Sequence, residues 1–384
     1  MKPKKTKRSK PSKGGLVVAG GGTAGHLLPG IAVADELVNR GWPPEGVLFM
    51  GSSRGIEAEK VPAAGYELLA LSGRGLNGRQ LSLQNLLNLM GIIWAVLRGS
   101  WMVRRRRPSI VLSLGGYAAL PAGIGALLCR VPLVLAEQNA AASASNRLMT
   151  KFAKAAAVPC SGTGLKNEVV TGNPVRRAVL EANHKGRSLR TELGWPEDQP
   201  VVVVFGGSLG SRRINEAVWE AARIGDLPLV HHVVGHRDWR DLPTSLPINV
   251  MSHEYDDDLP KAMAASDLVV CRPGGSSVAE IAVLGLPAVL IPLPNAPNDH
   301  QRRNAERLVD EGLAVLIPDE ELNGQRFHDE IERMLLRFTS DTDPDIARRE
   351  RSVGHDDATE KVADLVITHC LMPPIALHGK DATL

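Results

Sequence analysis

The chain has 384 residues, of which 43% are apolar and 23% are charged, and this length predicts two globular domains of ordinary size. It contains no run of 18 apolar residues, so we expect no membrane-spanning helix, and its four cysteines form no C-x-x-C pair that would suggest a metal or redox site. Residues 1–13 hold seven basic side chains and no acid, which predicts a disordered basic arm. The chain has a net charge of +3, so the remaining residues carry −4, and we expect no nucleic-acid partner.

The first half of the chain repeats short apolar runs that are typical of buried parallel strands. Residues 16–19 form the first run, which opens into a glycine-rich turn at 20–26 and then into a stretch with helical spacing. Further strands are expected at 47–50, 110–114 and 133–136. The pattern predicts a doubly wound α/β domain over 14–172.

An apolar stripe with the spacing of an amphipathic helix runs through residues 83–101 and is followed by an arginine run. Such stripes usually pack in a core. Tryptophans beside arginines also fit a helix that lies in the surface of an anionic membrane. The candidate membrane contacts are Trp94, Trp101, Arg104 and Arg105.

The second half repeats the plan of the first about 180 residues later. A strand at 201–205 ends in a glycine-rich turn, and further strands are expected at 229–234, 268–271 and 288–291. Two such copies indicate two Rossmann-like domains. The expected linker is the Asn173-Pro174 region followed by the polar stretch at 182–200. The other expected parts are a C-terminal domain over 173–344, a helix at 345–371 that returns to the first domain, and a flexible tail at 372–384.

The first glycine turn matches the dinucleotide pattern Gly20-x-Gly22-x-x-Gly25. An NAD enzyme also needs an acid at the end of the second strand, where this chain has none before Glu57; Arg54 leaves a 2′-phosphate possible. In either case the glycines direct N–H groups at a negative ligand. His26 begins the following helix, whose positive end favours a neutral imidazole, so the residue is a candidate general base or a capping histidine.

The second domain carries a polar cluster after its strand at 268–270. Residues 274–277 predict another anion-binding turn, and Glu280, one turn into the next helix, has acceptor oxygens that match a ribose diol. A polar helix start follows at 298–301, which a plain helix cap would also explain. Asp256–Asp258 resembles a metal-binding D-x-D motif, but its place before a helix favours a dipole role.

Seven segments, taken together and in order, resemble the MurG family of peptidoglycan glycosyltransferases over about 20–310. They are GGGTAGH (20–26), SLGGYAALP (113–121), AEQNA (136–140), GNPVR (172–176), FGGSLGSRRIN (205–215), CRPGGSSVAE (271–280) and NDHQRRNA (298–305). The resemblance implies a GT-B fold, in which two Rossmann-like domains face each other across a deep cleft, and a C-terminal helix that packs on the first domain.

The same resemblance implies an inverting enzyme that moves GlcNAc from UDP-GlcNAc to the C4 hydroxyl of MurNAc in lipid I, giving lipid II, with no metal or other cofactor. It places the enzyme peripherally on an anionic membrane, at the cytoplasmic face of the inner membrane, with cell-wall synthesis and division proteins as candidate partners. A related UDP-sugar transferase with another lipid acceptor is the main alternative. An NAD(P) oxidoreductase explains only the first loop, and a non-catalytic nucleotide-sugar binder need not keep both His26 and Glu137.

Carried over by position, the family implies His26 as the first choice of base and Glu137 as the second. Ala24 replaces a glycine that is common in the first loop, and 273–277 is more polar than usual. The implied donor contacts are Thr23, Ala24, Gly25, Asn139, Arg176, Ser208, Tyr255, Gly275, Ser276, Ser277, Glu280 and Gln301.

Overall fold

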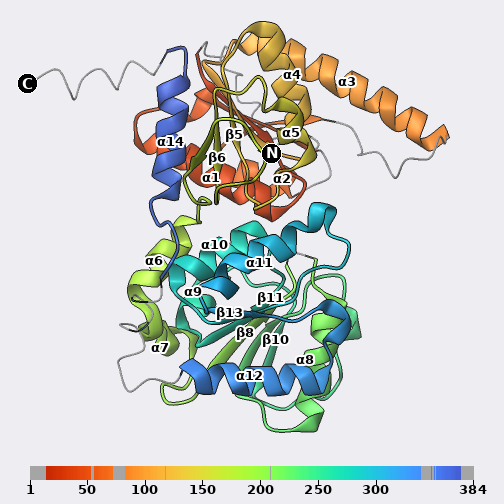
Figure 1. Cartoon of the computed structure of the whole chain (residues 1–384), viewed down its shortest axis with the longest axis vertical. Coiled ribbons are helices and arrows are strands. Elements are labelled where there is room, and N and C mark those ends of the chain that lie inside the picture. The colour runs from red at the N-terminus through yellow and green to blue at the C-terminus, as the bar shows by residue number, and fades with distance from the viewer. Residues whose placement is uncertain are drawn as a thin grey trace, which may run out of the picture.

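The computed structural model describes residues 14–52, 56–71, 83–116, 118–207, 209–338, 347, 350 and 352–372. Two α/β domains are stacked along the long axis of the molecule (Figure 1). Several sequence predictions lie outside the described residues: the arm at 1–13, Arg54, Tyr117, Ser208, the side chain of Ala24 and the tail beyond 372.

The first domain contains a seven-stranded parallel sheet in the order β3-β2-β1-β4-β5-β6-β7. Its strands are β1 (Leu16–Gly20), β2 (Val47–Ser52), β3 (Glu67–Leu71), β4 (Ile110–Gly115), β5 (Leu133–Ala136), β6 (Ala155–Val158) and β7 (Glu168–Val170). Its helices are α1 (Ala24–Asn39), α2 (Glu57–Ala63), α3 (Leu83–Arg106), α4 (Ala119–Cys129) and α5 (Ala144–Met149). Strands β3, β6 and β7 were not predicted, because alanine-rich or half-exposed strands lack a strong apolar pattern.

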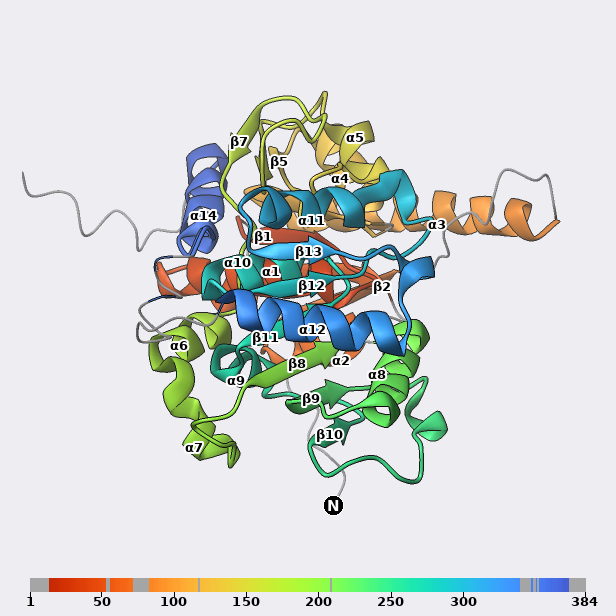
Figure 2. The same ribbon diagram turned by 60° about the horizontal axis from the view of Figure 1, so that its bottom comes forward.

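The second domain contains a six-stranded parallel sheet in the order β10-β9-β8-β11-β12-β13. Its strands are β8 (Val201–Phe205), β9 (Leu229–Val233), β10 (Val250–His253), β11 (Leu268–Cys271), β12 (Ala288–Leu290) and β13 (Ala314–Leu316). Its helices are α8 (Arg212–Ile224), α9 (Leu259–Ala265), α10 (Gly275–Leu284), α11 (His300–Asp310) and α12 (Gly324–Phe338). Side chains of α8 and α12 pack on one face of the sheet and those of α9 and α10 on the other; Figure 2 shows α12 crossing in front of the strands.

Of the predicted linker, Asn173-Pro174 does lie between β7 and the next helix, but the polar stretch at 182–200 is not a linker. It contains the end of α6 (Arg177–Lys185) and all of α7 (Leu189–Leu193), and both helices contact α9 of the second domain. The guanidinium of Arg190 is fully buried, donates to Ala265 O at 2.9 Å and pairs with Asp267 at 2.5 Å. A charged side chain can be buried when all its donors are paired, so a segment that is polar in sequence can still pack against the domain.

The chain crosses between the domains twice and ends on the first. Helix α14 (Ala358–His369) packs against α1, with Val362 and Val366 buried in the core that β1 and β4 form with α1. The predicted fold, with two Rossmann-like domains and a returning C-terminal helix, is therefore confirmed. Short 3-10 turns complete the structure at Pro44–Gly46, Gly186–Ser188, Trp239–Asp241, Pro297–Asp299 and Asp319–Glu321.

Candidate functional site

The candidate site lies where the carboxyl ends of the central strands of the two domains face each other. In the first sheet Gly20 at the end of β1 pairs with Gly115 at the end of β4, and in the second sheet β8 and β11 end side by side. These are the topological switch points at which open α/β sheets bind ligands. The glycine turns meet across the boundary, where Ser276 Oγ donates to Gly25 O at 3.0 Å.

His26 lies in the first turn of α1, and its Nδ1 is 3.0 Å from Thr23 Oγ1. Burial lowers the pKa of the imidazole; the negative charge of Glu137 opposes this shift, and His300 adds to it. The ring is therefore neutral at pH 7. This is the protonation state that a general base needs.

Glu137, the second candidate base, is buried and already accepts four hydrogen bonds. Its Oε1 accepts from Asn139 N at 3.1 Å and Asn139 Nδ2 at 3.2 Å, and its Oε2 accepts from Ser143 N at 2.8 Å and Asn146 Nδ2 at 2.9 Å. These four donors occupy both carboxylate oxygens, so the side chain orients the loop around it. The geometry therefore favours His26 as the base.

Glu280 and Arg176, which the family resemblance placed at the donor, lie in direct contact. Arg176 Nε and Nη2 donate to the two carboxylate oxygens of Glu280 at 2.6 and 2.9 Å. Glu280 is buried on α10, whereas Arg176 begins α6 beside the first crossing between domains. A ribose diol that binds Glu280 must compete with this bidentate pair.

The other donor candidates lie along the second domain's side of the boundary. Gly275, Ser276 and Ser277 begin α10, and a Cβ on Gly275 would lie 2.1 Å from Gln138 O of the first domain. Gln301 on α11 accepts from Leu293 N at 2.8 Å, which leaves its amide group free to donate. The exposed ring of Tyr255 is stacked on His236 with 5.7 Å between ring centroids.

Glu57 is a site residue that was not predicted from the sequence. It is buried at the start of α2, and its Oε1 accepts from Gly22 N at 2.6 Å and from Ser52 N at 3.3 Å. The carboxylate thus occupies the position at which the first glycine turn would hold a phosphate. This argues against the dinucleotide alternative, and an acid in the first turn after strand two was the available signal.

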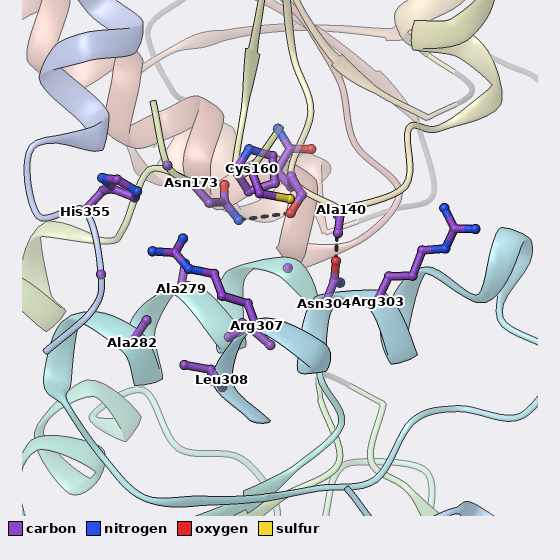
Figure 3. A pocket seen from close by; sticks show the side chains of 16 residues that line it. Ala140, Cys160, Asn173, Ala279, Ala282, Arg303, Asn304, Arg307, Leu308 and His355 are labelled. Carbon is purple, nitrogen blue, oxygen red and sulfur yellow. Dashed lines mark hydrogen bonds between the residues drawn. The ribbon is translucent and has the colours of Figure 1, made fainter. Parts of the chain in front are cut away.

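A pocket lies between the two domains, where the chain crosses from one to the other. Its lining includes Gly172 at the first crossing and Gly354 at the second. In Figure 3, Asn173 and Ala140 of the first domain face Asn304 and Arg307 of α11. The walls include two arginines and no acid.

The aspartate run lies at the N-terminus of α9, where negative charge interacts favourably with the helix dipole. Asp258 is the N-cap residue of α9, and Asp256 accepts from Asp258 N at 2.7 Å and contacts His231 Nε2 at 2.9 Å. No cluster of metal-binding side chains occurs among the residues with described positions.

The stripe on α3 faces outward, so the core interpretation of its described part is wrong. Trp94 is 64% exposed, Trp101 is 53% exposed and Arg104 and Arg105 are exposed, with Arg105 over the ring of Trp101 at 5.1 Å. In both whole-chain views α3 extends away from the first domain (Figures 1 and 2). The opposite face, which includes Val103, packs against α4. Within the described ranges, no helix is both long and apolar enough to span a bilayer.

Comparison with known proteins identifies the two-domain fold as that of a glycosyltransferase. Residues 16–158 match the N-terminal domain of glycosyltransferase family 28, and residues 201–364 match its C-terminal domain. The chain is 36% identical over 365 residues to a UDP-N-acetylglucosamine--N-acetylmuramyl-(pentapeptide) pyrophosphoryl-undecaprenol N-acetylglucosamine transferase of Anaeromyxobacter sp. (strain Fw109-5), covering 91% of this chain and 92% of the relative. The enzyme of the same name from Nitrosococcus oceani is 36% identical, with coverage of 91% and 97%. The chain therefore belongs to this family of N-acetylglucosamine transferases, the MurG family.

Solved structures support the same fold. MurG of Acinetobacter baumannii superposes with a TM-score of 0.69 at 24% identity, covering 92% of this chain and 99% of that one. A UDP-GlcNAc 2-epimerase of Neisseria meningitidis, bound to UDP-GlcNAc, has a TM-score of 0.65 at 16% identity, with coverage of 93% and 100%. At these identities the likeness concerns architecture alone.

Proposed function

We propose that the chain is an inverting transferase that moves GlcNAc from UDP-GlcNAc to the C4 hydroxyl of MurNAc in lipid I and so forms lipid II. The observation that carries this proposal is the contact between the glycine turn at 20–26 and the turn at 274–277. A neutral histidine lies on one side of their contact, and the Arg176–Glu280 pair lies on the other. Such a site brings a base from one domain to a nucleotide-sugar held by the other.

The reaction is a single displacement. His26 accepts the proton of the C4 hydroxyl while its oxygen attacks C1 of GlcNAc from the face opposite UDP. The C1–O bond to the β-phosphate breaks, UDP leaves with the electron pair, and an α-linked donor becomes a β-1,4 product. N–H groups at the start of α10, together with Arg176, stabilise the developing charge on the phosphate.

Donor binding rearranges the Arg176–Glu280 pair. The ribose hydroxyls donate to Glu280, which releases the guanidinium to turn toward the diphosphate. Uracil binds at the backbone of Tyr255, and the GlcNAc hydroxyls meet Gln301 and Asn139.

The acceptor is a lipid, and α3 is the surface that meets its membrane. Exposed tryptophans beside exposed arginines fit the interface of an anionic bilayer. The enzyme then acts peripherally at the cytoplasmic face of the inner membrane, where cell-wall synthesis and division proteins are its proposed partners.

The test uses radiolabelled UDP-GlcNAc with a lipid I analogue or with diacylglycerol, each with and without a chelator. We expect labelled lipid and free UDP from lipid I alone, unaffected by chelation. Glu280→Ala should weaken UDP binding strongly, whereas Glu181→Ala, which removes an exposed acid on α6, should not. Product from diacylglycerol alone would support the alternative acceptor, and no product with either would refute the proposal.

A further inference from the structure

Asn304 on α11 connects the two domains at the candidate donor site. It is 6% exposed, and its Oδ1 accepts from Ala140 N at 2.8 Å, a contact drawn in Figure 3. Its Nδ2 donates to Asn139 Oδ1 at 3.1 Å and to Pro273 O at 3.1 Å. One side chain of the second domain therefore binds the loop after β5 in the first domain and the loop after β11 in its own.

These contacts fix the amide of Asn139 at both ends. Its Nδ2 donates to Glu137 Oε1 at 3.2 Å within the first domain, while its Oδ1 accepts from Asn304 across the boundary. An amide held in this way retains one N–H and one lone pair for a ligand. The second anchor exists only while the domains are together.

Two further polar contacts between described residues of the two domains do not involve Asn139. Ser276 Oγ donates to Gly25 O at 3.0 Å, and Lys60 pairs with Asp257 at 3.6 Å near the surface. Among the hydrogen bonds of the described residues, Asn304 alone links α11 to Asn139.

We propose that Asn304 is a positioning residue that makes recognition of the donor sugar depend on domain closure. The proposal rests on the proposed function, because it assigns Asn139 to GlcNAc. When the domains part, Asn139 loses the partner that orients its carbonyl, so the sugar is held well only in the closed form. The uridine contacts at Glu280 lie within the second domain and do not need Asn304.

The experiment compares the dissociation constants of UDP and UDP-GlcNAc by titration calorimetry. Asn304→Ala should weaken UDP-GlcNAc about tenfold, the value of roughly one hydrogen bond, and leave UDP within twofold. Asn304→Asp should cost more, because a carboxylate would face Asn139 Oδ1 and Pro273 O. Asn139→Ala should reproduce the sugar-specific loss, and adding Asn304→Ala to it should change nothing further.

Asp257→Asn, which removes an interdomain ion pair that does not include Asn139, is the matched control and should alter neither constant. If Asn304→Ala weakened the binding of UDP and UDP-GlcNAc equally, Asn304 would only connect the domains, and the proposal would be overturned. Additive losses in the double variant, or no sugar-specific loss in Asn139→Ala, would overturn it too. Failure of Glu280→Ala to weaken UDP would instead refute the proposed function, so the two failures are distinguishable.

Discussion

We expect the imidazole of His26, the proposed base, to determine how turnover depends on pH. Because burial lowers its pKa below the ordinary 6.5, the neutral form persists as pH falls to 6.5, and the acid limb of the kcat profile should lie below that value. His26→Ala should lower kcat by roughly 10²- to 10⁴-fold and leave the dissociation constant of UDP-GlcNAc within a few-fold. Steady-state kinetics and calorimetry measure the two quantities. His184→Ala, at an exposed histidine, is the control; near-normal turnover of His26→Ala would exclude it as the base.

We expect a second histidine to contribute to the loss of stability at low pH. His232 is fully buried, lies 2.9 Å from Asn215 Oδ1, and has its pKa lowered to about 3, chiefly by burial. In the unfolded chain this imidazole binds a proton with a pKa near 6.5, whereas in the folded chain it stays neutral until the pH falls to about 3. The free energy of unfolding therefore falls by about 1.4 kcal/mol for each pH unit between 6.5 and 3.

We therefore expect His232→Gln to flatten the loss of stability between pH 6.5 and 4.5, although it lowers stability at pH 7. Urea unfolding at several pH values measures this. An unchanged slope would show that other groups cause the acid sensitivity, and His236→Gln, at an exposed histidine, provides the comparison.

At the level of elements, α3 carries the membrane prediction. Replacing Trp94 and Trp101 by alanine and Arg104 and Arg105 by glutamine should lower sedimentation with anionic liposomes at least tenfold, because both apolar insertion and charge attraction are lost. Zwitterionic liposomes should bind the native chain weakly. Leu336→Ala, at a 70% exposed leucine on α12, should bind like the native chain. Unchanged sedimentation of the fourfold variant would exclude α3 as the docking surface.

Helix α14 belongs to the core of the first domain despite its place at the end of the chain. Val366→Ala removes two fully buried methyl groups and should destabilise that domain by about 2 kcal/mol. Hydrogen exchange of β1 and β5 should accelerate, while exchange of β8 should not. Leu371→Ala, at a 60% exposed side chain, is expected to be neutral. Equal acceleration in both sheets would indicate that the domains unfold together.

At the level of the whole molecule, Gly275 sets how closely the domains approach. A Cβ there would lie 2.1 Å from Gln138 O, a backbone atom that cannot easily yield. Gly275→Ala should hold the domains apart, increase the radius of gyration in small-angle scattering and lower turnover, although alanine favours a helix. Gly91→Ala on α3, where a Cβ meets nothing within 4 Å, is the control. An unchanged radius of gyration and turnover would show that the boundary adapts.

The two-domain plan was predictable because the signals that encode it are local. Strands such as β8 are continuous apolar runs, and the glycine turns after β1 and β8 are short, so neighbouring residues suffice to place them. The same holds for Glu280, which follows its strand and turn by a fixed spacing. The segment at 182–200 was mispredicted because its polar residues are paired with partners such as Asp267, about 80 residues away.

The sequence by itself determined the two-domain plan, the glycine turns and the family, because each is encoded in short motifs of neighbouring residues. Only the tertiary structure decided that α3 faces outward. It also decided three contacts: the carboxylate of Glu57 accepts from Gly22 N in the first glycine turn, Arg176 pairs with Glu280, and Asn304 donates to Asn139. Those contacts join residues 35 to 165 positions apart. Which partner a polar side chain finds over such a distance depends on how the domains pack, and no local pattern records it.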